Sequence, residues 1–345
     1  MRGCEGHNAL QFSCRAFRPP SGPPLHQSAK PRAGSPRSLA GEIRSGCWLK
    51  LPPAIIPHAT PHSYGAVVRD LTKSSANSEE AVLDQITPVI LTYNEENNIA
   101  RTLDRLRWAR DVVVVDSFST DKTVSLIKSF PGVRLFQRAF DSHAQQWNYA
   151  VKDTSVATEW ILALDADYYL TDEFIREVSQ LTPTLEIDGY TTAFRYCILG
   201  HPLRGALYPP VTVLFRNRKG HYAQDGHTQR VAIDGSVREL VSRILHDDRK
   251  PLSHWLQAQD RYMRLEAEHI TEQEWFKLGV ADKLRTAPLV APFVVFWYCY
   301  IGKGLWLDGR LGLYYALQRM LAECVLALRL IEQDPTRSSS GQDTG

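Results

Sequence analysis

A run of four valines at residues 112–115 restricts most strongly how this chain of 345 residues can fold. A strand of β-branched residues with no polar face is typical of a parallel sheet covered by helices on both sides. Apolar runs of similar length and segments with helical spacing alternate around it. The expected strands are residues 86–91, 112–115, 133–136 and 160–164, and the expected helices are residues 97–108, 120–127 and 143–151. This alternation predicts an α/β fold with a doubly wound, mostly parallel sheet.

The pattern changes after residue 185. Residues 190–199 and 211–215 predict antiparallel strands that carry a loop across the ligand-binding site expected of such a sheet. Residues 256–269 predict a helix. Residues 286–302 contain no charged side chain. This stretch is shorter than the roughly 20 residues that span a bilayer. Its aromatic residues favour an interfacial or re-entrant helix, and a core or dimer helix is the alternative. Residues 311–331 predict an amphipathic helix.

Two basic residues bracket the charge-free stretch. Arg285 precedes it and Lys303 follows it. Long basic side chains at such positions can extend to lipid headgroups while Trp297 and Tyr298 lie at the interface. The sequence therefore predicts a membrane surface as a partner, with the protein peripheral or monotopic on the cytoplasmic face.

The N-terminal segment differs in composition from the rest of the chain. Residues 1–60 carry eight Lys or Arg but only two acidic residues, and they hold nine of the 20 prolines. Such a segment cannot bury enough apolar surface to fold. It lacks the apolar run of a signal peptide. It resembles a transit peptide only loosely, and a start codon placed too far upstream is the favoured explanation.

These patterns divide the chain into four expected regions. A disordered, basic, Pro/Ser-rich extension covers residues 1–84, and an α/β domain covers residues 85–275. Membrane-associating or packing helices cover residues 276–334, and a disordered tail covers residues 335–345. The six cysteines form no CxxC pair, which argues against a zinc site or a disulfide framework. The net charge of +2 argues neither for nor against nucleic acid, and no nucleic-acid partner is expected.

Two carboxylates follow the expected strand at residues 160–164. Asp165 and Asp167 stand where the chain leaves the sheet, and ligands of doubly wound sheets bind beyond the carboxyl ends of the strands. Carboxylate oxygens suit Mg²⁺ or Mn²⁺, which can neutralise charge on a diphosphate leaving group. A solvated turn or a helix cap is the alternative. The position after an apolar strand favours a metal site.

Polar residues also end the strand at residues 112–115. Asp116 stands there, followed by Ser117, Ser119 and Asp121. A carboxylate at this position can accept hydrogen bonds from a ribose or from a base, and the hydroxyl groups add donors. The alternative is that Ser119 and Asp121 only cap the following helix.

Thr92, Tyr93, Asn94 and Glu95 close the strand at residues 86–91. Tyr93 could stack on a base, and Asn94 or Glu95 could bond to that base or to the sugar. Acidic residues are also favourable at a helix N-terminus. Composition alone favours this capping role.

The segments Thr92-Tyr93-Asn94-Glu95, Val115-Asp116-Ser117-Phe118-Ser119-Thr120-Asp121 and Leu164-Asp165-Ala166-Asp167, in this order, resemble glycosyltransferase family 2. Together with Gln146-Trp147-Asn148-Tyr149-Ala150 they resemble more narrowly the bacterial lipopolysaccharide-core β-glucosyltransferase branch. The resemblance covers about residues 86–275. It implies a GT-A fold and inverting transfer from a nucleotide-sugar donor to a saccharide or lipid-linked acceptor. It also implies a divalent metal and contact between Asp116 and the nucleotide.

We therefore expect two groups of binding residues. The expected donor-binding residues are Thr92, Tyr93, Asn94, Glu95, Asp116, Ser117, Gln146, Asn148 and Asp165. The expected metal ligands are Asp165, Asp167 and His246. Arg249 and Lys250 could hold diphosphate, although solvated side chains are the commoner outcome for such residues.

The chain departs from the family pattern at two places. Tyr168 stands where the family often has an acidic residue, and residues 226–229 stand where the branch often has a His-Glu pair. The identity of the general base, which removes a proton from the acceptor hydroxyl, is therefore left open between three carboxylates. Asp225 is the first candidate, and Asp247 and Asp248 are the rivals.

Two other classes of function compete with the glycosyltransferase. A phosphotransferase or phosphatase would use an aspartyl nucleophile after its first strand, whereas Asp165 and Asp167 follow the fourth expected strand. A non-catalytic nucleotide-sugar-binding protein would keep the fold and the donor site without the base.

Overall fold

The computed structural model describes residues 82–333 except residues 183–185 and 226–227, and it leaves out the side chains of residues 224–230. Residues 1–81 and 334–345 lie outside the described part. The predictions for the N-terminal extension and the C-terminal tail fall almost entirely on those residues.

A seven-stranded mixed sheet forms the centre of the described part, in the strand order β12-β6-β9-β4-β1-β2-β3. The four expected strands are confirmed as β1 (Ile86–Thr92), β2 (Val112–Asp116), β3 (Val133–Gln137) and β4 (Trp160–Asp165). They pair in parallel. The sheet continues antiparallel through β9 (Val211–Arg216) to β6 (Gly189–Thr192), and β12 (Val237–Glu239) forms its edge.

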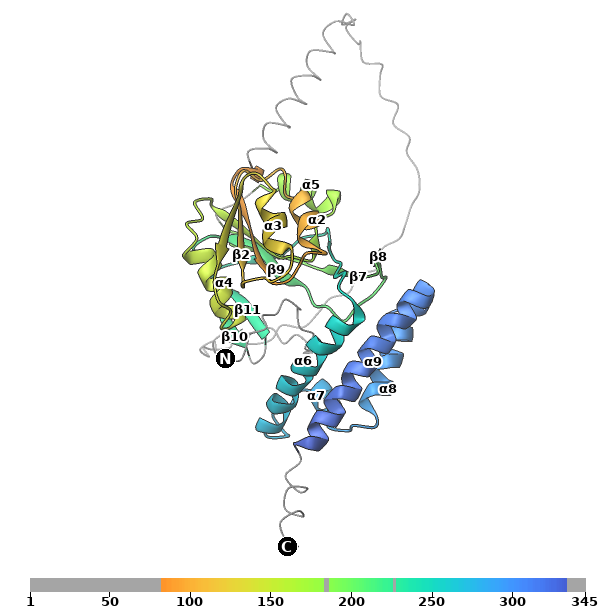
Figure 1. The fold of residues 1–345 in the computed structure, drawn as a ribbon. Helices are drawn as coiled ribbons and strands as arrows, with labels where there is room; N and C mark the ends of the chain where they lie inside the picture. The colour runs from red at the N-terminus through yellow and green to blue at the C-terminus, as the bar shows by residue number, and fades with distance from the viewer. Residues whose placement is uncertain (1–81, 183–185, 226–227, 334–345) are drawn as a thin grey trace, which may run out of the picture. The chain divides into compact units, whose positions relative to one another are not determined.

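Helices cover both faces of this sheet (Figure 1). Val112 and Val114 pack with α2 (Ile99–Asp104), α3 (Thr123–Lys128) and α5 (Asp172–Ser179) in one core. Val113 and Val115 pack with α4 (His143–Lys152) in the other. The prediction of a doubly wound sheet from the valine run is confirmed.

The first helix is shorter than predicted. It ends at Asp104 because the backbone N–H groups of Arg105 and Leu106 bond to Thr102 and Leu103, three residues back. This tighter turn closes the helix before residue 108, the expected end.

A four-stranded sheet stands beside the end of β4. It has the order β5-β13-β7-β8, formed by β5 (Tyr168–Tyr169), β13 (Ile244–His246), β7 (Phe194–Ile198) and β8 (His201–Pro202). The expected single strand at residues 190–199 is therefore two strands: β6 pairs antiparallel with β9, as predicted, but β7 pairs parallel with β13. The hairpin of β10 (Gly220–Asp225) and β11 (Thr228–Ile233) packs against α4.

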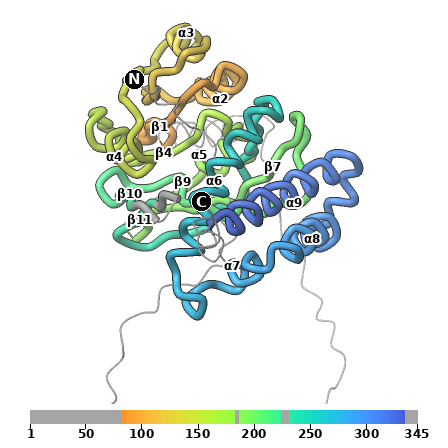
Figure 2. The backbone as a smooth tube through the Cα atoms, turned by 60° about the horizontal axis from the view of Figure 1, so that its bottom comes forward, coloured from red at the N-terminus to blue at the C-terminus, as the bar shows by residue number. Residues whose placement is uncertain are grey.

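The C-terminal part is helical, as Figure 2 shows. It comprises α6 (Leu252–Glu272), α7 (Val280–Arg285), α8 (Ala291–Trp297), the single turns η1 (Tyr298–Gly302) and η2 (Leu305–Asp308), and α9 (Gly309–Glu332). Helices α6 and α9 lie side by side (Figures 1 and 2). The two longest predicted helices are thereby confirmed. Helix α9 also reaches the four-stranded sheet, since Tyr315 packs on Tyr196 of β7 with ring centroids 5.2 Å apart.

The expectation that Arg285 extends to lipid is wrong. Its guanidinium is buried and donates to Glu266 of α6 at 2.7 Å and to Glu323 of α9 at 3.0 Å. A buried charge requires paired partners, and two glutamates of neighbouring helices provide them. Arg285 therefore ties α6, α7 and α9 together.

Candidate active site

The sheet register brings two of the expected site carboxylates to one edge. Asp165 is in register with Leu91 of β1, and Asp116 is in register with Thr92, the next residue of the same strand. Strand β1 lies between β4 and β2, so both carboxylates stand at the carboxyl ends of the parallel strands, on either side of β1. This is the edge at which doubly wound sheets bind ligands.

The acidic pair is buried at the end of β4. Asp165 is 9% exposed and Asp167 is 4% exposed. Burial raises the pKa of Asp165 to about 7, and the neighbouring Asp167 charge adds to this increase. For Asp167, burial is outweighed by the charge and hydrogen bond of His246, so its pKa lies below the usual value.

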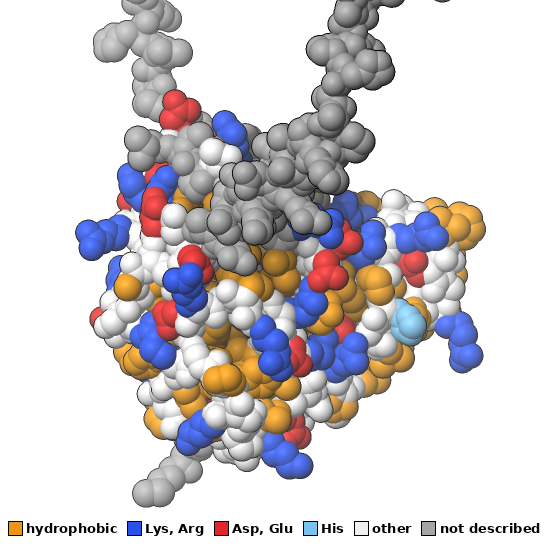
Figure 3. Space-filling view, turned by 90° about the horizontal axis from the view of Figure 1, so that it is seen from above, with side chains coloured by type: hydrophobic (Ala, Val, Ile, Leu, Met, Phe, Trp, Pro, Cys, Tyr) orange, Lys and Arg blue, Asp and Glu red, His pale blue; other side chains and the backbone are white. Residues whose placement is uncertain are grey.

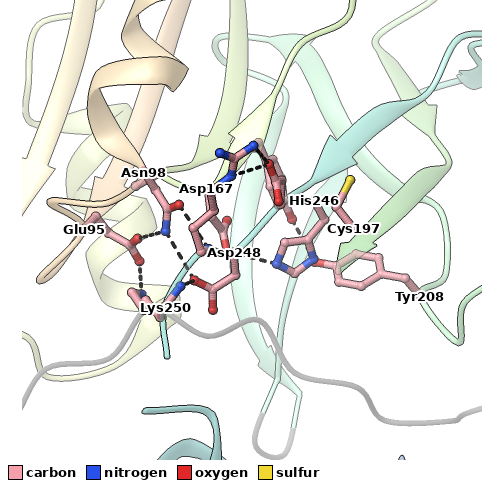
Figure 4. A network of polar contacts seen from close by, with 12 residues as sticks. Glu95, Asn98, Asp167, Cys197, Tyr208, His246, Asp248 and Lys250 are labelled. Atoms are coloured by element: carbon pink, nitrogen blue, oxygen red, sulfur yellow. Dashed lines mark hydrogen bonds and ion pairs between the residues drawn. The ribbon is translucent and has the colours of Figure 1, made fainter. Parts of the chain in front are cut away.

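His246 stands beside this pair because β13 runs antiparallel to β5, which places His246 in register with Tyr168. Its Nε2 lies 2.9 Å from Oδ2 of Asp167, as Figure 4 shows. Although burial opposes it, the Asp167 carboxylate raises the pKa of the imidazole. The rings of Tyr168, Tyr196 and Tyr208 surround it edge-on, with centroids 4.9–5.5 Å away. The structure thus brings two of the three expected metal ligands, Asp167 and His246, into contact, and Asp165 ends the strand that precedes them.

Two buried atoms of this group lack a hydrogen bond within the described part of the chain: Oδ1 of Asp167 and Nδ1 of His246. A divalent cation would supply a partner and would offset the repulsion between the two carboxylates, and oxygen and imidazole ligands suit Mg²⁺ or Mn²⁺. Among the described residues, no three His, Cys, Asp or Glu side chains already form a cation cage. Binding would replace the bond between His246 and Asp167. The residue types therefore fit a metal.

Hydrogen bonds between the loops after β1 and β2 hold both loops firmly. Asn94 donates its N–H to Ser119 and accepts from the N–H of Thr120, each at 2.8 Å. Asp116 is fully buried and accepts from the N–H of Ser119 at 2.9 Å and from Gln137 at 3.1 Å. Asp121 accepts from the N–H of Thr123 at 2.9 Å, but the N-cap of α3 is Lys122 and no described side chain caps this helix, so the predicted cap by Asp121 is wrong.

The remaining expected donor residues lie around this edge in different settings. Thr92 is buried, and its hydroxyl has no hydrogen-bond partner among the described residues, whereas Tyr93 is half-buried. Gln146 of α4 donates to the hydroxyl of Ser117 at 3.1 Å. The amide of Asn148 is engaged elsewhere, since it donates to and accepts from the backbone of Tyr222 at 2.8 and 3.1 Å. Asn148 thereby fixes β10 against α4.

A buried ion pair joins the loop after β1 to the loop after β13 (Figure 4). Glu95 and Lys250 bond to one another, and their side chains are 0% and 4% exposed. Burial raises the pKa of Glu95 to about 8, against the attraction of Lys250. Burial would lower the pKa of Lys250, but the Glu95, Asp248 and Asp167 carboxylates raise it. The helix-capping role that composition favoured for Glu95 is therefore wrong, and so is the solvated position expected for Lys250.

The candidate bases lie in different surroundings. Asp247 is buried and pairs with Arg101 at 2.7 Å and with Arg249 at 2.9 Å. Asp248 is half-buried between the Glu95–Lys250 pair and His246 (Figure 4). The backbone of Asp225 belongs to β10, but its side chain lies outside the described part.

Comparison with known proteins concerns the segment that carries most of these site residues. Residues 87–228 match glycosyl transferase family 2. This segment therefore carries the sequence pattern of a family 2 glycosyltransferase domain. The chain is also 24% identical over 278 residues to the lipopolysaccharide core biosynthesis glycosyltransferase LpsC of Rhizobium meliloti (strain 1021), with 75% of this chain and 96% of that protein covered.

Other similarities are shorter. An uncharacterized glycosyltransferase of Rickettsia bellii is 32% identical over 32% of this chain and 37% of its own length. Glycosyltransferase SunS of Bacillus subtilis (strain 168) is 32% identical over 41% of this chain and 33% of its own length. Among solved structures, S. aureus TarS 1–349 in complex with UDP-GlcNAc has a TM-score of 0.40 at 15% identity, covering 73% of this chain and 92% of that one.

The departure at Tyr168 has a packing explanation in this glycosyltransferase. Its ring is 3% exposed, and its hydroxyl lies 2.8 Å from that of Tyr208. An acidic side chain here would lose its hydration in a core packed with aromatic rings, which is costly for a charged group. Tyr168 therefore packs, together with Tyr208, against the imidazole ring of His246.

Sequence reasoning missed two residues of the site, Asn98 and Arg101. Both lie at the start of α2 and bond to the loop after β13, about 150 positions along the chain. No local sequence signal marks them, because Asn98 stands at a helix start but its side chain makes no capping bond there.

Proposed function

We propose that this glycosyltransferase is inverting and metal-dependent, and that it moves sugar from a nucleotide-sugar donor to a saccharide or lipid-linked acceptor of the cell envelope. The observation that carries the proposal is the buried group of Asp165, Asp167 and His246, at the same sheet edge as Asp116. Similarity to LpsC over nearly its whole length supports the lipopolysaccharide type of acceptor.

Each group of residues has a separate task in this reaction. Asp165, Asp167 and His246 would hold a divalent cation, which supplies positive charge for the diphosphate leaving group. Asp116 would accept a hydrogen bond from the nucleoside, with Ser117 and its partner Gln146 beside it. The rigid loops after β1 and β2 keep these acceptors in place before the donor arrives, which lowers the cost of ordering them.

A carboxylate on the acceptor side completes the mechanism. It takes the proton of the acceptor hydroxyl as that oxygen attacks the anomeric carbon opposite the leaving group, and this geometry inverts the configuration. Asp248 suits the task better than Asp247, because two guanidinium groups already neutralise Asp247. Asp225 remains the other candidate.

Sugar transfer with and without metal tests the proposal. Wild-type protein should release nucleoside diphosphate from one donor in the presence of Mn²⁺, and chelation should stop this. Asp167→Asn should abolish transfer while leaving the fold intact, whereas Asp172→Asn, at an exposed helix start, should retain it. Donor binding without transfer by the wild type would favour the non-catalytic binding protein instead.

We also propose that the C-terminal helices contact the cytoplasmic face of a membrane. Apolar side chains along α8, η1 and η2 are each more than half exposed: Phe293, Trp297, Tyr298, Ile301, Trp306 and Leu307. Trp and Tyr are the residues that concentrate at membrane interfaces. One described stretch, Leu305–Glu332, is long and apolar enough to cross a membrane by length and composition alone, but 44% of its apolar window is buried inside the protein, as in a packing helix.

One face of the molecule bears on the expectation of no nucleic-acid partner. On the face drawn in Figure 3, Lys and Arg side chains stand among acidic and apolar ones rather than in one basic patch. Nucleic-acid binding would require such a patch.

Point substitutions test membrane contact better than truncation, because removal of α9 would also strip Tyr315 from β7. The double variant Trp297→Glu/Trp306→Glu should no longer sediment with anionic liposomes. Val241→Glu, at a residue 89% exposed near the catalytic sheets, is the matched control and should bind as the wild type does. Equal sedimentation of all three proteins would leave these helices as packing or dimer elements.

A further inference from the structure

One buried amide connects the two loops that carry the candidate catalytic groups. Asn98 is 0% exposed. Its Nδ2 donates to Oε2 of Glu95 at 2.7 Å and to Oδ1 of Asp248 at 3.2 Å. Its Oδ1 accepts from Arg101 at 2.7 Å and from the N–H of Arg249 at 3.2 Å. Every donor and acceptor of this side chain is therefore used, and none of them caps α2.

The hydrogen bonds around Asp248 all involve the same oxygen. Oδ1 accepts from Asn98 and also from the N–H of Lys250 at 3.1 Å. The ammonium of Lys250 in turn bonds to Glu95, which closes a ring of contacts (Figure 4). Neither bond uses Oδ2. Fully satisfied buried networks specify one arrangement of their members, so this ring fixes the direction of the Asp248 carboxylate.

We infer that Asn98 is a positioning residue that holds Asp248 as the general base. This inference rests on the proposed function. The acceptor proton passes to Oδ2 of Asp248 while the acceptor oxygen forms its bond to the anomeric carbon. The bond from that carbon to the diphosphate oxygen breaks, and its electron pair leaves with the diphosphate.

An amide is the side chain that suits this position. Glu95 and Asp248 both need a donor, and one NH₂ group provides two hydrogens at a fixed angle. An aspartate would offer none and would repel both carboxylates. The amide oxygen accepts a hydrogen bond from Arg101 but carries no charge. The positive charge of Arg101 is therefore still available to pair with Asp247 at 2.7 Å. Asp247 and Asp248 are thereby held in separate roles.

A double-mutant cycle tests the inference. Asn98→Ala should lower kcat on the order of 10- to 100-fold, as misplacement of a reacting group does. The donor Kd should stay within about two-fold, because Lys250 still holds Glu95, the one expected donor residue that Asn98 contacts. In an Asp248→Asn background the same substitution should change kcat by less than about two-fold. Asn97→Ala, at the exposed neighbouring asparagine, should behave as the wild type.

Several results would overturn the inference. Asn98→Ala could lower kcat equally in both backgrounds, which would show that it acts independently of Asp248. It could instead weaken donor binding and transfer together, which would show a merely structural role. Should Asn98→Ala fail to fold, Asn98→Ser keeps one donor and must show the same non-additivity.

The outcome also separates this inference from the proposed function. A wild type that transfers sugar, together with a fully active Asp248→Asn variant, contradicts the inference alone. A wild type that transfers no sugar contradicts the proposed function and this inference with it.

Discussion

Replacing Asp165 by asparagine is expected to stabilise the metal-free protein, and more strongly as the pH rises. The pKa of Asp165 is raised by burial from its usual 3.8 to about 7. The folded state therefore keeps a proton that the unfolded chain releases, and stability falls as the pH rises through this window. Asparagine has no proton to lose, so it escapes this penalty.

The size of the effect follows from the shift. Each pKa unit corresponds to about 1.4 kcal/mol, so the full shift sets an upper limit of about 4 kcal/mol. Relaxation and water entry reduce such penalties, and we expect a gain of about 2–4 kcal/mol at pH 8. A pH of 5 is only about one unit above the pKa of Asp165 in the unfolded chain, so the gain there is about 1–2 kcal/mol.

Urea unfolding of both proteins at pH 5 and pH 8, in the presence of a chelator, measures this difference. Glu95, whose pKa is raised by burial to about 8, gives a slope of the same sign in both proteins, so it cancels in the comparison. Asp172→Asn is the control: this aspartate is exposed, and a hydrogen bond from Arg105 lowers its pKa, so its removal should bring no gain. Mn²⁺ should then stabilise the wild type at pH 8 but not Asp165→Asn. A gain that does not grow with pH would refute the reasoning.

Three further results are expected. Asp116→Ala should weaken donor binding by about 1–3 kcal/mol in titration calorimetry, the cost of an unpaired buried partner; unchanged affinity with intact metal binding would count against its role. Among Asp225→Asn, Asp247→Asn and Asp248→Asn, the variant of the true base should lose orders of magnitude in kcat with donor binding preserved, and three active variants would exclude all these candidates. A protein that starts at Ala81 should fold and transfer sugar as the full chain does, and loss of folding would show that the N-terminal segment contributes to the domain.

The strands that carry the site could be predicted because their signal is local. The valine run faces a core on each side, so no polar residue interrupts it. The positions of Asp116 and Asp165 then follow from the rule that parallel strands end at one edge. Residues 190–199 were harder, because the chain changes sheets at Ala193 and β7 pairs with β13, about 50 positions later. No periodicity within the segment reports such a distant partner.

The polar contacts of the site depend on tertiary structure in the same way. Lys250 pairs with Glu95 across 155 positions, and Arg285 pairs with Glu323 across 38. A lysine or arginine in a polar context is usually solvated, and only a partner brought in from another element makes its burial tolerable. The amide of Asn98, which serves three segments at once, has no sequence signature for the same reason.

Metal-dependent binding of a nucleotide-sugar tests the central claim most directly. Thermal unfolding of the wild type and of Asp167→Asn should be followed with a panel of nucleotide-sugars, with Mn²⁺ and with a chelator. One donor should raise the Tm of the wild type in proportion to ln(1 + [L]/Kd), and only when Mn²⁺ is present. Asp167→Asn should show no such increase. A donor that stabilises both proteins equally in the presence of the chelator would contradict the claim.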